Sequence, residues 1–145
     1  MQRLKAWTPA FAWMGVIFAM SAMPGDVSGG QSDSLLSFVL GIISLLFGEN
    51  AAAGIPVDFL HLLIRKAAHM TEYAVLFLLY RRALRLENAK RSGLYALLLC
   101  ALYASTDEFH QGFVADRGPS VIDVGIDTLG AAVAWGICCI KRKRN

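Results

Sequence analysis

Charged residues are scarce in this chain: they make up 17% of its 145 residues, whereas hydrophobic residues make up 56%. The mean hydropathy is +0.49. A soluble globule of this size needs more polar residues than this to cover its surface. The composition therefore excludes an ordinary soluble domain and favours an integral membrane protein.

Cysteine is also scarce, and Cys100, Cys138 and Cys139 all lie within apolar segments. They lack the spacing of a metal site, and two adjacent cysteines are poorly placed to bridge each other. We therefore expect three small core residues. No short motif such as His-Glu-x-x-His is present either, so the sequence predicts no metal and no other cofactor.

A nucleic-acid footprint is missing, although the net charge is +3. The Lys and Arg residues flank hydrophobic stretches and form no basic patch interleaved with aromatic residues. We therefore expect membrane lipids, and no nucleic acid, among the partners of the protein. The oligomeric state stays open.

Long apolar stretches are what the chain does contain. A bilayer core about 30 Å thick takes about 20 helical residues to cross. Counting such lengths from the flanking basic residues predicts four transmembrane helices, over residues 6–23, 57–86, 93–112 and 121–140. The expected fold is an all-α integral membrane bundle, formed by a single domain over residues 1–145.

The first stretch has a second interpretation. A basic start, an apolar middle and small residues near Ser21 are also typical of a cleaved signal peptide. Trp7 and Trp13 favour a retained membrane anchor, because Trp is frequent at membrane interfaces. Loss of this helix would also leave an odd number of spans.

A shorter apolar segment covers residues 34–48, which is only about 22 Å of helix. That length is too short to span a membrane comfortably, so we expect an external interfacial or re-entrant helix. Small residues recur on one face of it and are expected to pack against the bundle. They are Ser34, Ser37, Gly41, Ser44 and Gly48.

Basic residues predict the orientation. They are concentrated in residues 81–91 and 141–144, and the positive-inside rule places such clusters in the cytoplasm. The protein is therefore expected to be a multi-pass protein of the bacterial cytoplasmic membrane with both termini cytoplasmic. Asp116 and Arg117 would lie in an external turn, as an ion pair that contributes little.

Polar residues recur at helical spacing near the external ends of three predicted spans. Arg65, His69 and Glu72 share one stripe of the second span, because residues three or four apart lie on the same face. Asp107 and Gln111 form a second stripe, and Ser120, Asp123 and Asp127 form a third. Three helices thus contribute polar groups at overlapping depth, which predicts one shared cavity open to the outside.

Each stripe alone also fits interhelical hydrogen bonding, worth roughly 0.6–2 kcal/mol. The number of acids argues for more than that, since five carboxylates outnumber the three basic residues near them. A partly desolvated site of this kind must share protons, bind a metal or receive a cationic ligand. We therefore favour a functional site. The five acids are Glu72, Asp107, Glu108, Asp123 and Asp127.

Three ordered motifs resemble those of the VanZ-like family. They are Arg65-Lys66-x-x-His69-x-x-Glu72-Tyr73, then Asp107-Glu108-x-x-Gln111-x-Phe113 with Arg117 following, then Asp123 and Asp127-x-x-Gly130. The resemblance covers about residues 8–137. It implies a small multi-helix bacterial membrane protein, and the named member of the family is associated with low-level resistance to the lipoglycopeptide teicoplanin.

The resemblance also implies a set of functional residues. The matching positions, expected to bind ligand, are Arg65, Lys66, His69, Glu72, Asp107, Glu108, Gln111, Arg117, Asp123 and Asp127. The leading hypothesis is a cell-envelope protein whose outward cavity binds a lipid-linked or amphiphilic ligand and confers glycopeptide tolerance. Its basic residues would contact phosphate or carboxylate, and its carboxylates and Gln111 would contact amine, amide or hydroxyl groups.

Two alternatives remain open. One is an intramembrane enzyme in which His69 and a carboxylate, Glu72 or Asp107, act as base and acid on a lipid-linked substrate. A metal-dependent version would use His69, Asp107, His110 and Asp123, although their spacing does not favour it. The other is a proton-coupled exporter, which fits less well because transporter sites usually lie near the membrane midplane.

Overall fold

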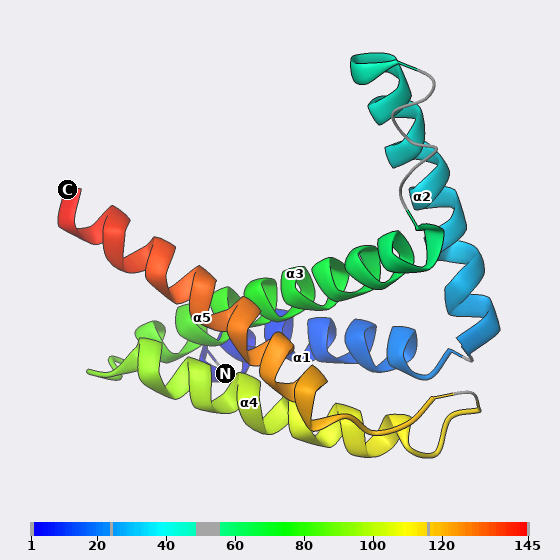
Figure 1. The fold of residues 1–145 in the computed structure, drawn as a ribbon. Helices are drawn as coiled ribbons and strands as arrows, with labels where there is room; N and C mark the ends of the chain where they lie inside the picture. The colour runs from blue at the N-terminus through cyan, green and yellow to red at the C-terminus, as the bar shows by residue number, and fades with distance from the viewer. Residues whose placement is uncertain (1, 24, 49–55, 116, 145) are drawn as a thin grey trace.

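The computed structural model describes residues 2–23, 25–48, 56–115 and 117–144, and within them it contains five helices and no strand. The helices are α1 (Gln2–Ser21), α2 (Gly25–Phe47), α3 (Val57–Leu86), α4 (Ser92–Gln111) and α5 (Val121–Arg144). The prediction of an all-helical chain is therefore confirmed for the described residues. Figure 1 shows α1, α3, α4 and α5 gathered into a bundle, with α2 standing across one end of it.

The central helix is α3, which packs against all four other helices. Its buried residues between Tyr73 and Ala83 lie three or four positions apart, which places them on one core-facing stripe. Fully buried core residues come from four helices: Ile17, Tyr73, Leu76, Phe77, Cys100, Ala104 and Ala131. Helix α1 is held in this bundle by polar contacts as well, because Tyr103 donates a hydrogen bond to the backbone oxygen of Met14 at 2.7 Å.

Small residues let the helices approach closely. Gly130 of α5 faces the backbone of Met70 on α3, where an added Cβ would lie 2.3 Å from the Met70 oxygen. On α4, Ala96, Cys100 and Ala104 form the buried stripe. Small side chains at such crossings are typical of helix packing in membranes.

The cysteine prediction holds for one position and fails for another. Cys100 is fully buried, as expected, whereas the side chain of Cys139 is exposed. The reason is the course of α5, whose C-terminal end leaves the bundle (Figure 1). A residue there can be apolar without being part of the core.

Helix α2 differs from the short helix predicted for residues 34–48. It begins at Gly25 and has 23 residues, so it includes a Gly- and Ser-rich stretch of low helix propensity that the predicted bounds left out. The expected packing of its small face is wrong. Among its described side chains Leu36 is the buried one, whereas Ser37 and Gly41 are exposed and an added Cβ at Gly41 meets nothing within 4 Å. A contact of 3.2 Å between His61 Nε2 and Asp33 Oδ1 joins α2 to α3.

One helix among the described residues is both long and apolar enough to cross a membrane by itself, namely Val121–Lys141. A shorter apolar helix covers Leu35–Phe47. Helix α3 is long enough, but the polar stripe in its N-terminal half lowers its hydropathy. Large apolar side chains are nevertheless exposed on α1, α3, α4 and α5, including Phe11, Leu78, Leu102, Phe109 and Ile137.

The two ends of the bundle differ in charge. The turn between α3 and α4 and the C-terminus lie towards one end, which we call the basic end (Figure 1). Asn88 in that turn has φ 58°, a left-handed conformation that Asn adopts more readily than most residues. The end of α1, the start of α3 and the segment between α4 and α5 lie at the opposite, acidic end.

Candidate functional site

Polar side chains from α1, α3, α4 and α5 meet towards the acidic end, in the arrangement that we call the polar cluster. Asp127, Asp107 and Glu108 are buried within it, with 1%, 2% and 3% of their surface exposed. The segment between α4 and α5 adds one more residue. The cluster consists of Ser21, Lys66, His69, Glu72, Tyr73, Asp107, Glu108, Gln111, Arg117, Asp123 and Asp127.

Asp107 accepts the hydrogen bond that links the side chains of α1 and α4. Its Oδ2 accepts a hydrogen bond of 2.7 Å from Ser21 Oγ and one of 3.2 Å from Gln111 Nε2. Gln111 Nε2 also donates to Ser21 Oγ at 3.1 Å. Asp107 and Gln111 share a face because they are four residues apart on α4. The spacing predicted this pairing, but Ser21 was not predicted.

Arg117 reaches the same region from the segment between α4 and α5. Its NH1 lies 3.4 Å from the backbone oxygen of Ser21. Partial burial, and then the positive charge of Arg65, lower the pKa of the Arg117 guanidinium, which still remains protonated at neutral pH. The predicted partner Asp116 lies outside the described residues. Arg117 thus brings a positive charge to the rim of the buried carboxyl groups.

Two pairs connect α3 to α5. Lys66 Nζ forms an ion pair with Asp123 Oδ1. One turn further along both helices, His69 Nδ1 lies 3.5 Å from Asp127 Oδ1, which is too long for a firm hydrogen bond. The acid–base hypothesis named Glu72 or Asp107 as the carboxylate that works with His69. In the structure Asp127 lies next to the imidazole, while Asp107 interacts electrostatically with His69.

Glu108 holds the start of α5. Its Oε2 accepts a hydrogen bond of 2.8 Å from the backbone nitrogen of Ser120, and Ser120 Oγ accepts one of 3.3 Å from the backbone nitrogen of Asp123. The first backbone N–H groups of a helix have no partner within the helix, so side-chain oxygens stabilise them. One oxygen of Glu108 therefore has a structural role.

Glu72 and Arg65 lie at the margin of the cluster. The backbone oxygen of Glu72 accepts a hydrogen bond of 3.0 Å from Trp13 Nε1. The side-chain carboxylate of Glu72 is partly buried and interacts electrostatically with Asp107 and Arg117. The Arg65 side chain is exposed. All ten residues predicted from the sequence thus lie in or beside one region, with Arg65 the most peripheral.

Several buried polar atoms of the cluster have no hydrogen-bond partner in the described part of the chain. This is unusual, because most buried polar groups in proteins are satisfied. The atoms are His69 Nδ1, the Tyr73 hydroxyl oxygen, Asp107 Oδ1, Glu108 Oε1, Arg117 Nε and both carboxylate oxygens of Asp127. Among the described residues, no Lys or Arg forms an ion pair with Asp107, Glu108 or Asp127. The site therefore offers more acceptors than the protein itself uses.

The sequence reasoning missed Ser21 and the Tyr73 hydroxyl. Ser21 ends an otherwise apolar helix, and its position alone does not reveal that it faces α4. Tyr73 follows Glu72 in the first motif, so the motif was its only signal. It interacts electrostatically with Asp107 and Asp127. Only the packing of the helices shows that both residues belong to the polar cluster.

The four residues considered for a metal-dependent enzyme are not arranged as a set of metal ligands. In the described ranges, no three His, Cys, Asp or Glu side chains are grouped so that they could hold a metal ion. His110, one of the four residues considered, has its ring 4.3 Å from that of Phe18. His69 lies beside Asp127, which was not in that set.

No curated protein and no solved structure matches the chain. The VanZ/LLP1 family model matches residues 6–142, a range that contains all three polar motifs and every residue of the polar cluster. The resemblance drawn from the motifs is confirmed, and the chain belongs to the VanZ/LLP1 family.

Proposed function

We propose that the chain is a four-span protein of the bacterial cytoplasmic membrane whose polar cluster binds the polar head of a lipid-linked or amphiphilic cell-envelope ligand. Family membership suggests a membrane protein, and α5 is apolar enough to cross a bilayer. The exposed apolar side chains of α1, α3 and α4 support further spans, because a soluble monomer rarely exposes so much apolar surface.

The unpartnered buried atoms carry the proposal. Three buried carboxyl groups in a region of low dielectric must be neutralised by protons or by a ligand that donates hydrogen bonds. Amine, amide or hydroxyl groups of a ligand would supply such donors to Asp107, Glu108 and Asp127. Arg65 and Arg117 would face its phosphate or carboxylate groups. Lipid-linked envelope precursors and lipoglycopeptides combine these groups with an acyl or isoprenoid chain, so tolerance to teicoplanin is the expected phenotype.

The orientation can be tested by labelling. In a variant with Cys100, Cys138 and Cys139 replaced by Ala, a cysteine introduced at Gly118 should react with a membrane-impermeant thiol reagent in intact cells. Gly118 is exposed, and an added Cβ there meets nothing within 4 Å. A cysteine at Asn88 should react only after the cells are lysed, because the neighbouring basic residues hold that turn in the cytoplasm. The reverse pattern would place the polar cluster at the cytoplasmic face.

Ligand binding is best tested at Glu72, whose partly buried carboxylate at the margin of the cluster would also accept a hydrogen bond from the ligand. Glu72→Gln preserves the shape of the side chain and removes the charge, so we expect at least about a tenfold loss of ligand affinity, the effect of losing one charged hydrogen bond. The measurement is growth of the expressing strain in teicoplanin, with the amount of folded protein in the membrane determined in parallel.

Glu87→Gln is the matched control. Glu87 is exposed at the basic end, and its Oε1 accepts a hydrogen bond of 2.8 Å from Trp7 Nε1, which a Gln oxygen can still accept. If Glu72→Gln supports the same growth as Glu87→Gln at equal protein level, Glu72 is not part of a binding site.

A second candidate is favoured by one specific geometry. Ser21 Oγ lies 2.7 Å from Asp107, and His69 lies beside Asp127, so a hydroxyl and an imidazole each have a carboxylate within reach. These pairs are suited to acid–base chemistry on a lipid-linked substrate. Mass spectrometry of membrane lipids separates the two functions. An enzyme would deplete one lipid species and create another, and His69→Ala would prevent this, whereas a binding protein would leave the species unchanged.

A further inference from the structure

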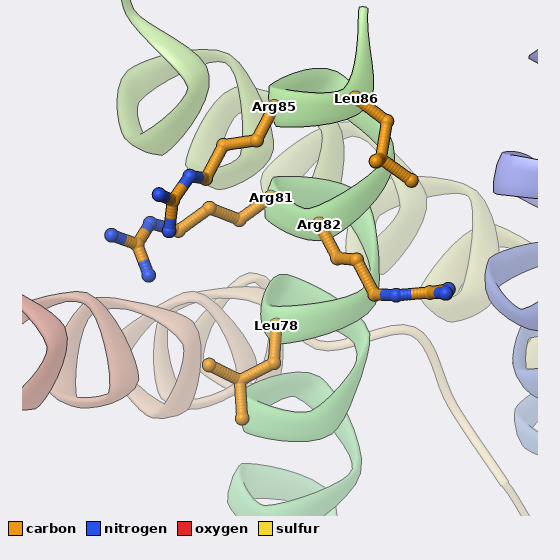
Figure 2. A pocket seen from close by; sticks show the side chains of 5 residues that line it. All are labelled: Leu78, Arg81, Arg82, Arg85 and Leu86. Atoms are coloured by element: carbon orange, nitrogen blue, oxygen red, sulfur yellow. The ribbon is translucent and has the colours of Figure 1, made fainter.

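A hollow opens at the basic end, far from the polar cluster along α3. Its volume is about 800 Å³, and it lies where the turn between α3 and α4 meets the C-terminal part of α5. A second hollow of about 380 Å³ shares Arg81 and Arg85 with it and adds Leu78, Arg82 and Leu86. Figure 2 shows the side chains of Arg81 and Arg85 extending together to one side of α3, with Leu78 a turn away on the same side.

The larger hollow is strongly positive. Arg81, Arg85, Lys90 and Lys141 line it together with the polar Asn88 and Ser92, and none of the described residues that line it has a carboxylate. The nearest acidic residue in the turn, Glu87, accepts the hydrogen bond of Trp7 from α1. Four like charges around one space repel each other, so a bound anion stabilises them. Arg pairs are suited to phosphate because each guanidinium can donate two parallel hydrogen bonds.

The adjoining apolar residues indicate which anion fits. Leu78 is exposed on the side of α3 to which the shared arginines extend (Figure 2), so the positive space continues directly onto an apolar part of the helix surface. A free phosphate ion would occupy only a small part of about 800 Å³. A phospholipid headgroup fits better, because its phosphate would lie among the cations while its acyl chains followed α3 into the bilayer.

We propose that the basic end of α3, α4 and α5 binds the headgroup of an anionic glycerophospholipid from the cytoplasmic leaflet. Arg81 and Arg85 bind the phosphate, and Lys90 and Lys141 contribute the other positive charges around it. The proposal requires the chain to lie in a membrane, but it does not depend on the ligand of the polar cluster. The two proposals can therefore fail separately.

The test uses the full chain purified in detergent and titrated with phosphatidylglycerol, phosphatidylcholine or inorganic phosphate. Thermal unfolding and native mass spectrometry report binding. We expect phosphatidylglycerol to raise the melting temperature and to remain bound in the mass spectrometer. Arg81→Gln combined with Arg85→Gln should raise the half-saturating lipid concentration by roughly tenfold or more, because each cation contributes to the affinity.

The matched control combines Lys5→Gln with Arg91→Gln. It removes the same charge from exposed residues that line neither hollow, so it should keep the response of the unmodified protein. If the double arginine variant is poorly folded, Lys141→Gln on the exposed end of α5 should show a smaller loss in the same direction. The proposal is overturned if both double variants respond equally, if phosphatidylcholine acts as strongly, or if inorganic phosphate alone reproduces the shift.

Discussion

Asp127→Asn is expected to abolish function while leaving the melting temperature unchanged or higher. Asp127 is 1% exposed, and neither of its carboxylate oxygens has a hydrogen-bond partner within the described residues. Removing an uncompensated buried carboxylate removes its desolvation penalty, so the free energy of unfolding should change by between zero and about +2 kcal/mol. Functional sites commonly show this trade of stability for activity. The measurement is the melting temperature in detergent beside growth in teicoplanin.

Asp123→Asn is the matched comparison, since the same change is made one turn earlier on α5. Asp123 has a cation beside it, because it forms an ion pair with Lys66. Both side chains are partly buried, so the loss of this pair should lower the free energy of unfolding by about 1 kcal/mol. If Asp127→Asn destabilises the protein as Asp123→Asn does, and function falls only with the amount of folded protein, the polar cluster merely holds the helices together.

Gly130→Ala is expected to have the largest effect on folding. The new Cβ would lie 2.3 Å from the backbone oxygen of Met70 and 2.7 Å from its Cα. A side chain could rotate away from such a clash, but the backbone of α3 can yield only if the two helices separate. Overpacking typically costs 1–3 kcal/mol, and we expect about 3 kcal/mol here because the contact is with backbone. Function should be lost as well, since the same interface carries the pairs Lys66–Asp123 and His69–Asp127.

Gly136→Ala provides the control on the same helix. An added Cβ at Gly136 meets nothing within 4 Å, and Ala has a higher helix propensity than Gly by about 1 kcal/mol. The variant should therefore be as stable as the unmodified protein or slightly more stable. Equal melting temperatures for Gly130→Ala and Gly136→Ala would show that α3 and α5 are not in close backbone contact at Gly130.

The sequence by itself determined the local structure and the family. Pro56 and Asp58 marked the start of α3, and the basic residues after Tyr80 marked its far end, so the predicted bounds 57–86 match the helix. The polar stripes were also readable, because helical periodicity places residues three or four apart on one face. The order of three such stripes was specific enough to identify the VanZ/LLP1 family.

Only the tertiary structure decided which polar groups meet. Periodicity assigns a residue to a face of its own helix, but it contains no information about which helix that face will contact. Ser21 and Asp107 are 86 positions apart and form a hydrogen bond of 2.7 Å, and His69 lies beside Asp127 rather than beside Glu72. The length of α2 was also not readable from local propensity: the helix begins at Gly25 although Gly and Ser have low helix propensity, and Asp33 within it contacts His61 of α3. Such contacts depend on the three-dimensional packing of distant segments, so no local pattern in the chain records them.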